Sequence, residues 1–189
     1  MPNWCFNTLH LKGPEAEIKR FVTANMSRPI RWPAIITPSG NELSPTTPDG
    51  PAYFSFNALC PCPQEVILRG YDTHRSGTPV DGIHWCRNNW GTKWDAYHLH
   101  ITPEMMGYHK GCQELKFSFE TANSAPSGWI ISMVQEFPRL SIHYEYALPD
   151  SLIGRTFEFQ DGSVRHFEEW DDARKQAEFG YEEEYWIQL

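Results

Sequence analysis

The sequence has no run of eighteen apolar residues, and its start, Met1-Pro2-Asn3-Trp4, has neither the basic nor the apolar segment of a signal peptide. It also contains no P-loop, no G-x-G-x-x-G, no H-E-x-x-H and no G-x-S-x-G pattern. These absences argue against a membrane span and against the common nucleotide, zinc-protease and serine-hydrolase sites. We therefore expect a cytoplasmic protein that has no membrane contact.

Cysteine is sparse and irregularly placed. The five cysteines are odd in number and follow no disulfide-scaffold spacing, and they do not supply the four suitably spaced thiolates of an iron–sulfur cluster. Cys60-Pro61-Cys62 is C-x-C rather than C-x-x-C, which favours two small buried side chains over a metal or redox pair. We expect reduced thiols and no cofactor.

Positive charge is scarce and unevenly placed. The net charge is −8; residues 1–157 hold 13 Lys/Arg against 14 Asp/Glu, whereas residues 158–189 hold 3 against 10. This balance disfavours nucleic-acid binding, although a local basic patch stays possible. The acidic C-terminal stretch either keeps a surface soluble or faces a basic protein partner.

Hydrophobic periodicity predicts the regular elements. Asp161-Gly162, between two short apolar runs, predicts a β-hairpin. Six prolines between residues 28 and 52 exclude a regular element there and indicate a surface insertion. In chain order we expect strands at 4–11, 53–59, 94–101, 115–120 and 140–146, and helices at 15–24, 64–69, 83–89, 129–137 and 170–179.

The order of these elements predicts an α+β fold, a ferredoxin-like split βαβ sandwich with a four-stranded antiparallel sheet and two helices on one face. Residues 1–165 would form this domain, with the insertion at 28–52 and a long connection at 64–112. An acidic C-terminal extension at 166–189 would pack on this domain. The last part of the chain would thus add a β-hairpin and a helix to the ferredoxin-like fold.

Six segments together are typical of a known family. They are Met1-Pro2-Asn3-Trp4-Cys5 with Asn7, Gly13-Pro14-Glu15, Phe56-Asn57-Ala58-Leu59, Asn89-Trp90-Gly91-Thr92-Lys93-Trp94-Asp95-Ala96-Tyr97, Phe119-Glu120-Thr121-Ala122, and Trp129 to Pro138. They resemble the YubB-type ferredoxin-like family of phages and conjugative plasmids. The resemblance covers about residues 1–165 apart from the insertion, and it implies the fold and a place for Phe56 to Leu59 in the second strand; the family supplies no catalytic residues.

The run from Trp85 to Tyr97 holds three tryptophans in thirteen residues and supplies the candidate binding residues Trp90, Lys93, Trp94 and Asp95. In one interpretation the tryptophans pack between the sheet and a connecting helix, in the link between the second and third core strands, and Lys93 pairs with Asp95. In the other, Trp90, Lys93 and Trp94 form an exposed platform that stacks bases. The polar face of the late strands shows no exposed aromatic pair, which favours packing.

A possible zinc set is His98, His100, His109 and Cys112. His98 and His100 would project from the same side of a strand, and the other two would return from the following loop. The spacing matches no common zinc site, which favours polar strand residues near a turn. Asp81, His84, Asp95 and His98 are the candidates for an enzyme site, which would require that they converge in a cleft.

We therefore favour a non-catalytic accessory protein of a mobile genetic element, which binds a host or element protein through the insertion or the acidic extension. The alternatives are single-stranded nucleic-acid binding through the Trp90–Trp94 region and a metal-dependent enzyme. The sequence does not indicate an oligomeric state.

Overall fold

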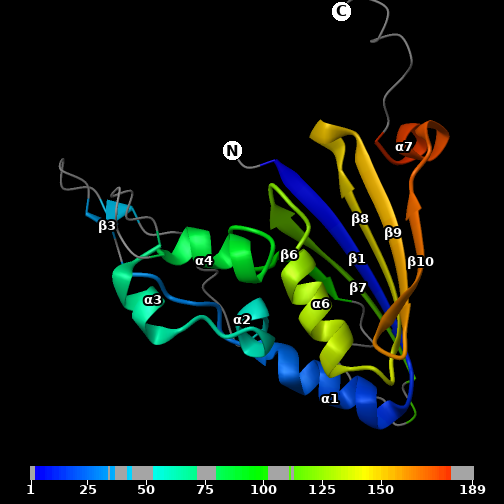
Figure 1. The fold of residues 1–189 in the computed structure, drawn as a ribbon, viewed down its shortest axis with the longest axis horizontal. Helices are drawn as coiled ribbons and strands as arrows, with labels where there is room; N and C mark the ends of the chain where they lie inside the picture. Colours follow the sequence, from blue (N-terminus) through cyan, green and yellow to red (C-terminus); the bar gives the residue numbers. More distant parts are fainter. Residues whose placement is uncertain are drawn as a thin grey trace, which may run out of the picture.

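The central feature of the molecule is a six-stranded antiparallel sheet in the order β10-β9-β8-β1-β7-β6 (Figure 1). The computed structural model describes residues 3–33, 35–36, 42–43, 53–71, 80–101, 111 and 113–179. The predicted α+β class is confirmed. The strands are β1 (Trp4–Lys12), β6 (Tyr97–Ile101), β7 (Glu114–Ala122), β8 (Ser141–Leu148), β9 (Ile153–Gln160) and β10 (Ser163–Glu169).

Helices pack mainly against one face of this sheet (Figure 1). The longest are α1 (Glu15–Asn25) and α6 (Ser127–Glu136), which follow β1 and β7 as expected. Within the described ranges, no helix has the length and apolarity that crossing a membrane requires. The remaining helices are α2 (Phe56–Leu59), α3 (Gln64–Arg69), α4 (Gly82–Asn89), a 3₁₀ turn at Pro149–Ser151, and α7 (Asp172–Phe179).

The expected strand at 53–59 is wrong. Tyr53–Phe54 forms a two-residue strand, β5, which pairs with β2 (Met26–Ser27), and the chain then turns into α2. Ser55 caps this helix by accepting a hydrogen bond from the Asn57 amide at 3.2 Å, so local capping overrides the β-propensity of the segment. The family-derived placement of Phe56 to Leu59 in a strand fails for the same reason. The second strand of the main sheet is therefore β6.

The insertion at 28–52 lies only partly within the described residues. Ile35–Ile36 (β3) and Glu42–Leu43 (β4) pair there as a short antiparallel ladder, so the expectation of no regular element is wrong at these four residues. The acidic extension expected at 166–189 includes residues 180–189, which lie outside the described part of the chain.

The hairpin predicted at Asp161-Gly162 is confirmed. Both residues have positive φ angles, 53° and 72°, as a two-residue hairpin turn of the I′ type requires. The hairpin adds β9 and β10 to the outer side of β8, which makes the sheet six strands wide instead of four. The division expected at 165/166 falls inside β10.

The core lies between the sheet and α1 and α6. Trp129, Ile130, Met133 and Val134 of α6 are buried. Phe21 of α1 contacts the rings of Phe117 and Phe137. The side chain of Asn7, a buried polar residue of β1, forms hydrogen bonds to both neighbouring strands. Its amide donates to the Phe119 carbonyl and Thr121 Oγ1, and its Oδ1 accepts from the Tyr144 hydroxyl at 2.7 Å. These hydrogen bonds tie β1 to both of its neighbours.

A junction, formed by Asn89–Thr92 and Ser127–Trp129, joins α4, α6 and the end of β7. The Trp90 carbonyl accepts from the backbone amides of Gly128 and Trp129 at 3.1 and 3.2 Å, which satisfies two free donors at the start of α6. Thr92 Oγ1 donates to the Ala122 carbonyl. Gly91 has φ +89°, and a Cβ on Gly128 would lie 2.1 Å from the Asn89 carbonyl oxygen.

Gly128→Ala should therefore destabilise the protein by more than about 3 kcal/mol, because the clash is with backbone and can only be relieved by separating α6 from the junction. Chemical denaturation followed by circular dichroism measures this. The control is Gln135→Ala, an exposed substitution on the same helix, which should change stability by less than about 0.5 kcal/mol. Equal stability of the two variants would disprove the close approach at Gly128.

Candidate functional site: an aromatic patch on the open sheet face

Trp90 is a core residue. It is 1% exposed, its ring meets Phe56 and Trp85 edge-on, and its Nε1 donates to the Cys60 carbonyl at 2.9 Å. A ligand therefore cannot stack on Trp90, and the packing interpretation is confirmed for this residue. The run lies in the connection from β1 to β6, so its expected place between the second and third sheet strands is wrong.

Asp95 acts as a remote cap of α2. Its Oδ1 accepts from the Phe56 and Ala96 amides at 2.8 and 2.9 Å, and its Oδ2 accepts from the Ser55 hydroxyl at 2.5 Å. Burial raises the pKa of Asp95 above its ordinary value, although these three donors act in the opposite direction. The expected Lys93–Asp95 pair is absent from the ion pairs of the described residues. Asp95 is thus a structural residue.

Trp94 belongs instead to an aromatic patch, which consists of Trp4, Phe6, Trp94, Tyr97 and His98, and Lys93 contacts this patch. The rings of Trp4 and Trp94 lie 6.2 Å apart, and Trp4 lies 5.6 Å from both Tyr97 and His98. Lys93 Nζ lies 4.7 Å from the centroid of the Trp94 ring, a cation–π contact.

Phe6 extends the patch to the middle of the sheet. It pairs with Glu120 of β7, which in turn pairs with Tyr97 of β6, so these three residues form one row across three strands. Phe6 is 47% exposed, whereas its chain neighbours Cys5 and Asn7 are buried on the helix side. The patch therefore lies on the face opposite α1 and α6.

Sequence reasoning missed Trp4 and Phe6 as surface residues because it considered only the late strands. The alternation in 4–12, in which Cys5, Asn7, Leu9 and Leu11 are buried, was sufficient to place Trp4 and Phe6 on the opposite face. The late strands do present a polar face, but β1 and β6 supply its aromatic rings.

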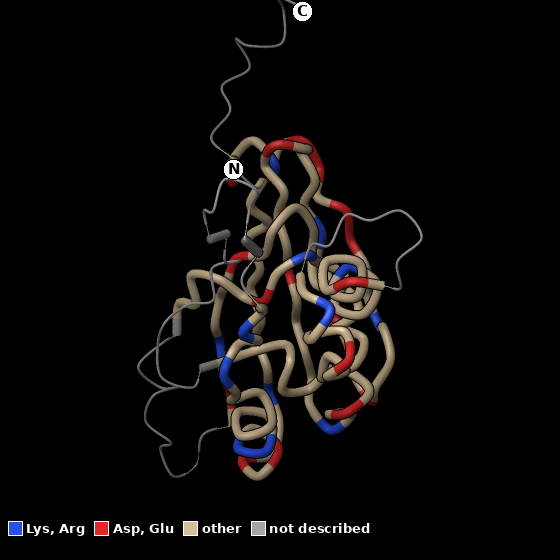
Figure 2. The backbone as a smooth tube through the Cα atoms, turned by 90° about the vertical axis from the view of Figure 1, so that its left-hand side faces the viewer, with Lys and Arg blue, Asp and Glu red and all other residues tan. Residues whose placement is uncertain are grey.

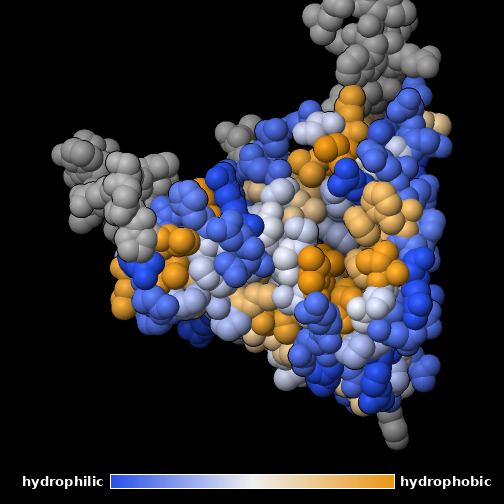
Figure 3. All heavy atoms as spheres, viewed as in Figure 1, coloured by the Kyte–Doolittle hydropathy of each residue, from blue (hydrophilic) through white to orange (hydrophobic). Residues whose placement is uncertain are grey.

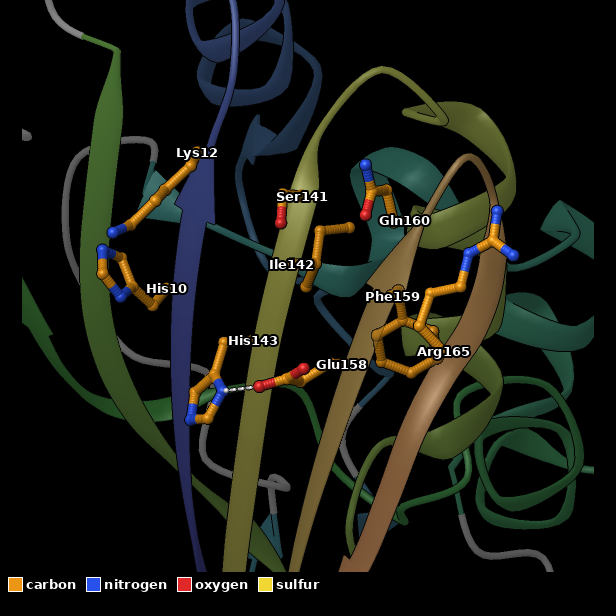
Figure 4. A pocket seen from close by; sticks show the side chains of 9 residues that line it. All are labelled: His10, Lys12, Ser141, Ile142, His143, Glu158, Phe159, Gln160 and Arg165. Atoms are coloured by element: carbon orange, nitrogen blue, oxygen red, sulfur yellow. Dashed lines mark ion pairs between the residues drawn. The ribbon is translucent and has the colours of Figure 1, made fainter.

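The rest of this face is polar and carries charges of both signs, several of which are paired, whereas Lys116, opposite His10 in the register, is exposed and forms no ion pair among the described residues. His10 and Lys12 contact Glu114, His98 contacts Glu120, and His143 lies near Glu145 and Glu158. Both signs are interspersed along the described backbone (Figure 2). A shallow hollow of about 360 Å³ lies on this face and extends over β1, β8, β9 and β10 (Figure 4). The residues that line it are His10, Lys12, Ser141, Ile142, His143, Glu158, Phe159, Gln160 and Arg165.

The zinc set is only half visible, since His109 and Cys112 lie outside the described residues. His98 and His100 lie on the same side of β6, as expected, since His98 faces Glu120, His100 pairs with Ser118 and Leu99 packs against the core. One extra residue bulges between Tyr97 and His100, and His98 has φ 43°. His98 Nδ1 lies 2.8 Å from Glu120 Oε2. Over the described part of the chain, no group of three or more His, Cys, Asp or Glu residues could hold a metal.

The four residues considered for an enzyme site make separate contacts. Asp81 caps α4, accepting from the His84 amide at 3.1 Å and facing its Nδ1 at 2.7 Å. Asp95 caps α2, and His98 faces Glu120.

Burial raises the pKa of the thiols of Cys5 and Cys62 to about 12 and about 11, so both remain protonated at neutral pH and are poor nucleophiles.

Asp95 should give the protein a specific pH dependence. Because its folded pKa is raised above the ordinary 3.8, its contribution to stability is complete below that value and is lost as the pH rises through the folded pKa. Asp95→Asn keeps the oxygen that accepts from Phe56 and Ala96 but does not ionise. The free energy of unfolding of the wild type minus that of Asp95→Asn should therefore fall between acidic and neutral pH. Urea unfolding at a series of pH values measures it, and parallel curves would contradict the buried carboxyl group.

Comparison with known proteins relates this fold to a crystal structure of another protein. No family model and no curated protein matches the sequence. Among solved structures, the protein api92 from Yersinia pseudotuberculosis, described as DUF1281, is similar to this chain with a TM-score of 0.61 at 11% sequence identity. The match covers 90% of this chain and 99% of that one. The two chains are thus similar in fold.

Proposed function

We propose that this protein is a non-catalytic interaction protein, and that the aromatic patch is its recognition surface. The observation that carries the proposal is the position of Phe6, which is about half exposed in the middle of an open sheet face, in the same row as Tyr97. A soluble protein gains nothing in folding stability from an aromatic ring left in water, whereas such rings dominate the energy of binding interfaces.

The charge around the patch favours a protein partner. A nucleic-acid backbone needs several free cations, but on this face Lys12, His10 and His98 already lie against carboxylates. Lys93 and Lys116 are the lysines here without an ion pair among the described residues, and the whole chain carries −8. A partner that presents apolar side chains with a mixed polar rim matches the patch better. The partner would be a host or element protein.

We further propose that the sheet is built on a ferredoxin-like core of the YubB type, and that the protein originates from a phage or plasmid. The strand order β8-β1-β7-β6, with α1 after β1 and α6 after β7, supports a split βαβ plan extended by the β9–β10 hairpin. The origin rests on the sequence resemblance alone.

Phe6→Ala should abolish binding of the partner protein. Truncation of a central aromatic residue costs about 2–4 kcal/mol of binding free energy, or about 30- to 1000-fold in affinity. The tagged wild type should capture a stoichiometric protein from host lysate, and Phe6→Ala and Trp94→Ala should lose it while retaining their folded spectra. Leu68→Ala, at an exposed apolar residue of α3, is the matched control and should retain it. Equal capture by the wild type and Phe6→Ala would refute the proposal.

A second candidate function, single-stranded nucleic-acid binding, is favoured by the contact of Lys93 with Trp94. Tryptophan fluorescence in a titration with oligothymidylate at low salt separates the two. The protein-binding proposal predicts no quenching. Salt-sensitive quenching that is lost in Lys93→Gln and Phe6→Ala would favour nucleic acid instead.

A further inference from the structure

The helix-side face of the β9–β10 hairpin carries a second, independent aromatic surface. Ring contacts link Tyr144 and Tyr146 of β8 to Phe157 of β9, and Phe157 continues to Phe159 and Phe167 at 6.0 and 5.0 Å. We call these five residues the ladder. Tyr144 and Phe159 are buried, whereas Phe167 is 50% exposed, so the ladder emerges from the core towards the edge strand β10.

Exposed aliphatic side chains lie on the same side of the sheet as the ladder. Val164, on the same side of β10 as Phe167, and Ile131, on α6, are both 56% exposed. Figure 3 shows hydrophobic side chains gathered over α6 and the hairpin on this face. Contiguous apolar surface of this kind marks interaction sites on soluble proteins.

A cation with unused donors lies among these residues. Arg155 projects from β9 on the ladder side, beside Tyr146, and its Nη1 donates to the Tyr146 hydroxyl at 3.1 Å. Its Nε is buried and has no hydrogen-bond partner, and among the described residues no carboxylate forms an ion pair with Arg155, although Glu169 lies opposite it in the register. A guanidinium in this state favours a carboxylate, which can accept two of its N–H groups.

The width of the uncovered face indicates the shape of the occupant. Two added strands widen the sheet by about 10 Å, since neighbouring strands lie about 4.8 Å apart. A helix with its side chains is about 10–12 Å across. The hairpin thus adds about the width of one helix to the sheet beyond β8, and its turn approaches the C-terminal end of α6 at Gly162.

From these observations we propose that the ladder, with Val164, Ile131 and Arg155, is a docking site for an amphipathic α-helix of another protein. The helix packs beside α6 as a further helix on the sheet, inserts apolar side chains against Phe167 and Val164, and presents an Asp or Glu to Arg155. This surface lies on the opposite face of the sheet from the aromatic patch, so the inference does not depend on the function proposed for that patch.

Selection of phage-displayed random 16-residue peptides on the full-length protein tests the site. Enriched peptides should carry apolar residues at i, i+3 or i+4, and i+7, together with one carboxylate. For a synthetic peptide from this pool, Val164→Ser/Phe167→Ser should weaken binding at least about 30-fold and Arg155→Met about tenfold. Replacing the acidic residue of the peptide with its amide should have the same effect as Arg155→Met, and the two changes together should cost no more than either alone.

Two matched variants control for folding and specificity. Leu68→Ser removes an exposed apolar side chain of α3, outside both surfaces, and Arg165→Met removes an arginine of the same hairpin that is paired with Asp161; both should bind as the wild type does. Peptides that lack a carboxylate, or that bind Val164→Ser/Phe167→Ser normally, would overturn the proposal. A dimer in sedimentation that this double variant dissociates would also overturn it, because a second copy would then occupy the site. So would peptide binding that appears only after removal of residues 180–189, because the chain's own end would then occupy the site.

Discussion

The arrangement of the whole molecule depends on the burial of Trp90. Its indole donates to Cys60 and its carbonyl accepts from the first free amides of α6, so a single residue holds the segment before α3, the end of α4 and the start of α6 together. Glycine at 91 and 128 is required because these backbones touch. After this junction Thr92 donates to the Ala122 carbonyl at the end of β7, and the chain continues into β6, the edge strand that pairs with β7.

The tryptophan-rich run therefore has two different roles within a few residues. Trp90 and Asp95 stabilise the fold, the first as a packed ring and the second as a remote helix cap. Trp94 and Tyr97 reach the open face, where Trp4 and Phe6 of β1 meet them. The opposite face is divided in a similar way, because α1 and α6 cover the inner strands and leave the ladder of the hairpin partly in water.

Local patterns were sufficient for much of this fold. The alternation in β1 and β7, the helical spacing of α6 and the Asp161-Gly162 turn each depend on neighbouring residues, and the structure has these elements as predicted. The failures depend on distant partners. The start of α2 at Phe56 depends on the local cap by Ser55 and also on Asp95, 39 residues away, which accepts the Phe56 amide. The bulge between Tyr97 and His100 follows from pairing with β7. No local pattern indicates that Trp170 packs on Gly154 of β9 and thereby fixes the start of α7 on the open face.

The central claim is that the tryptophan-rich run divides into a buried scaffold and a partly exposed aromatic surface. Hydroxyl-radical footprinting of the free protein with mass spectrometry measures this most directly, because the rate of ring oxidation follows exposure. The account predicts rapid oxidation of Phe6, slower but clear oxidation of Trp94, and protection of Trp90 and Trp129 until the protein unfolds. Oxidation of Trp90 as fast as that of Trp94 in the folded protein would contradict it.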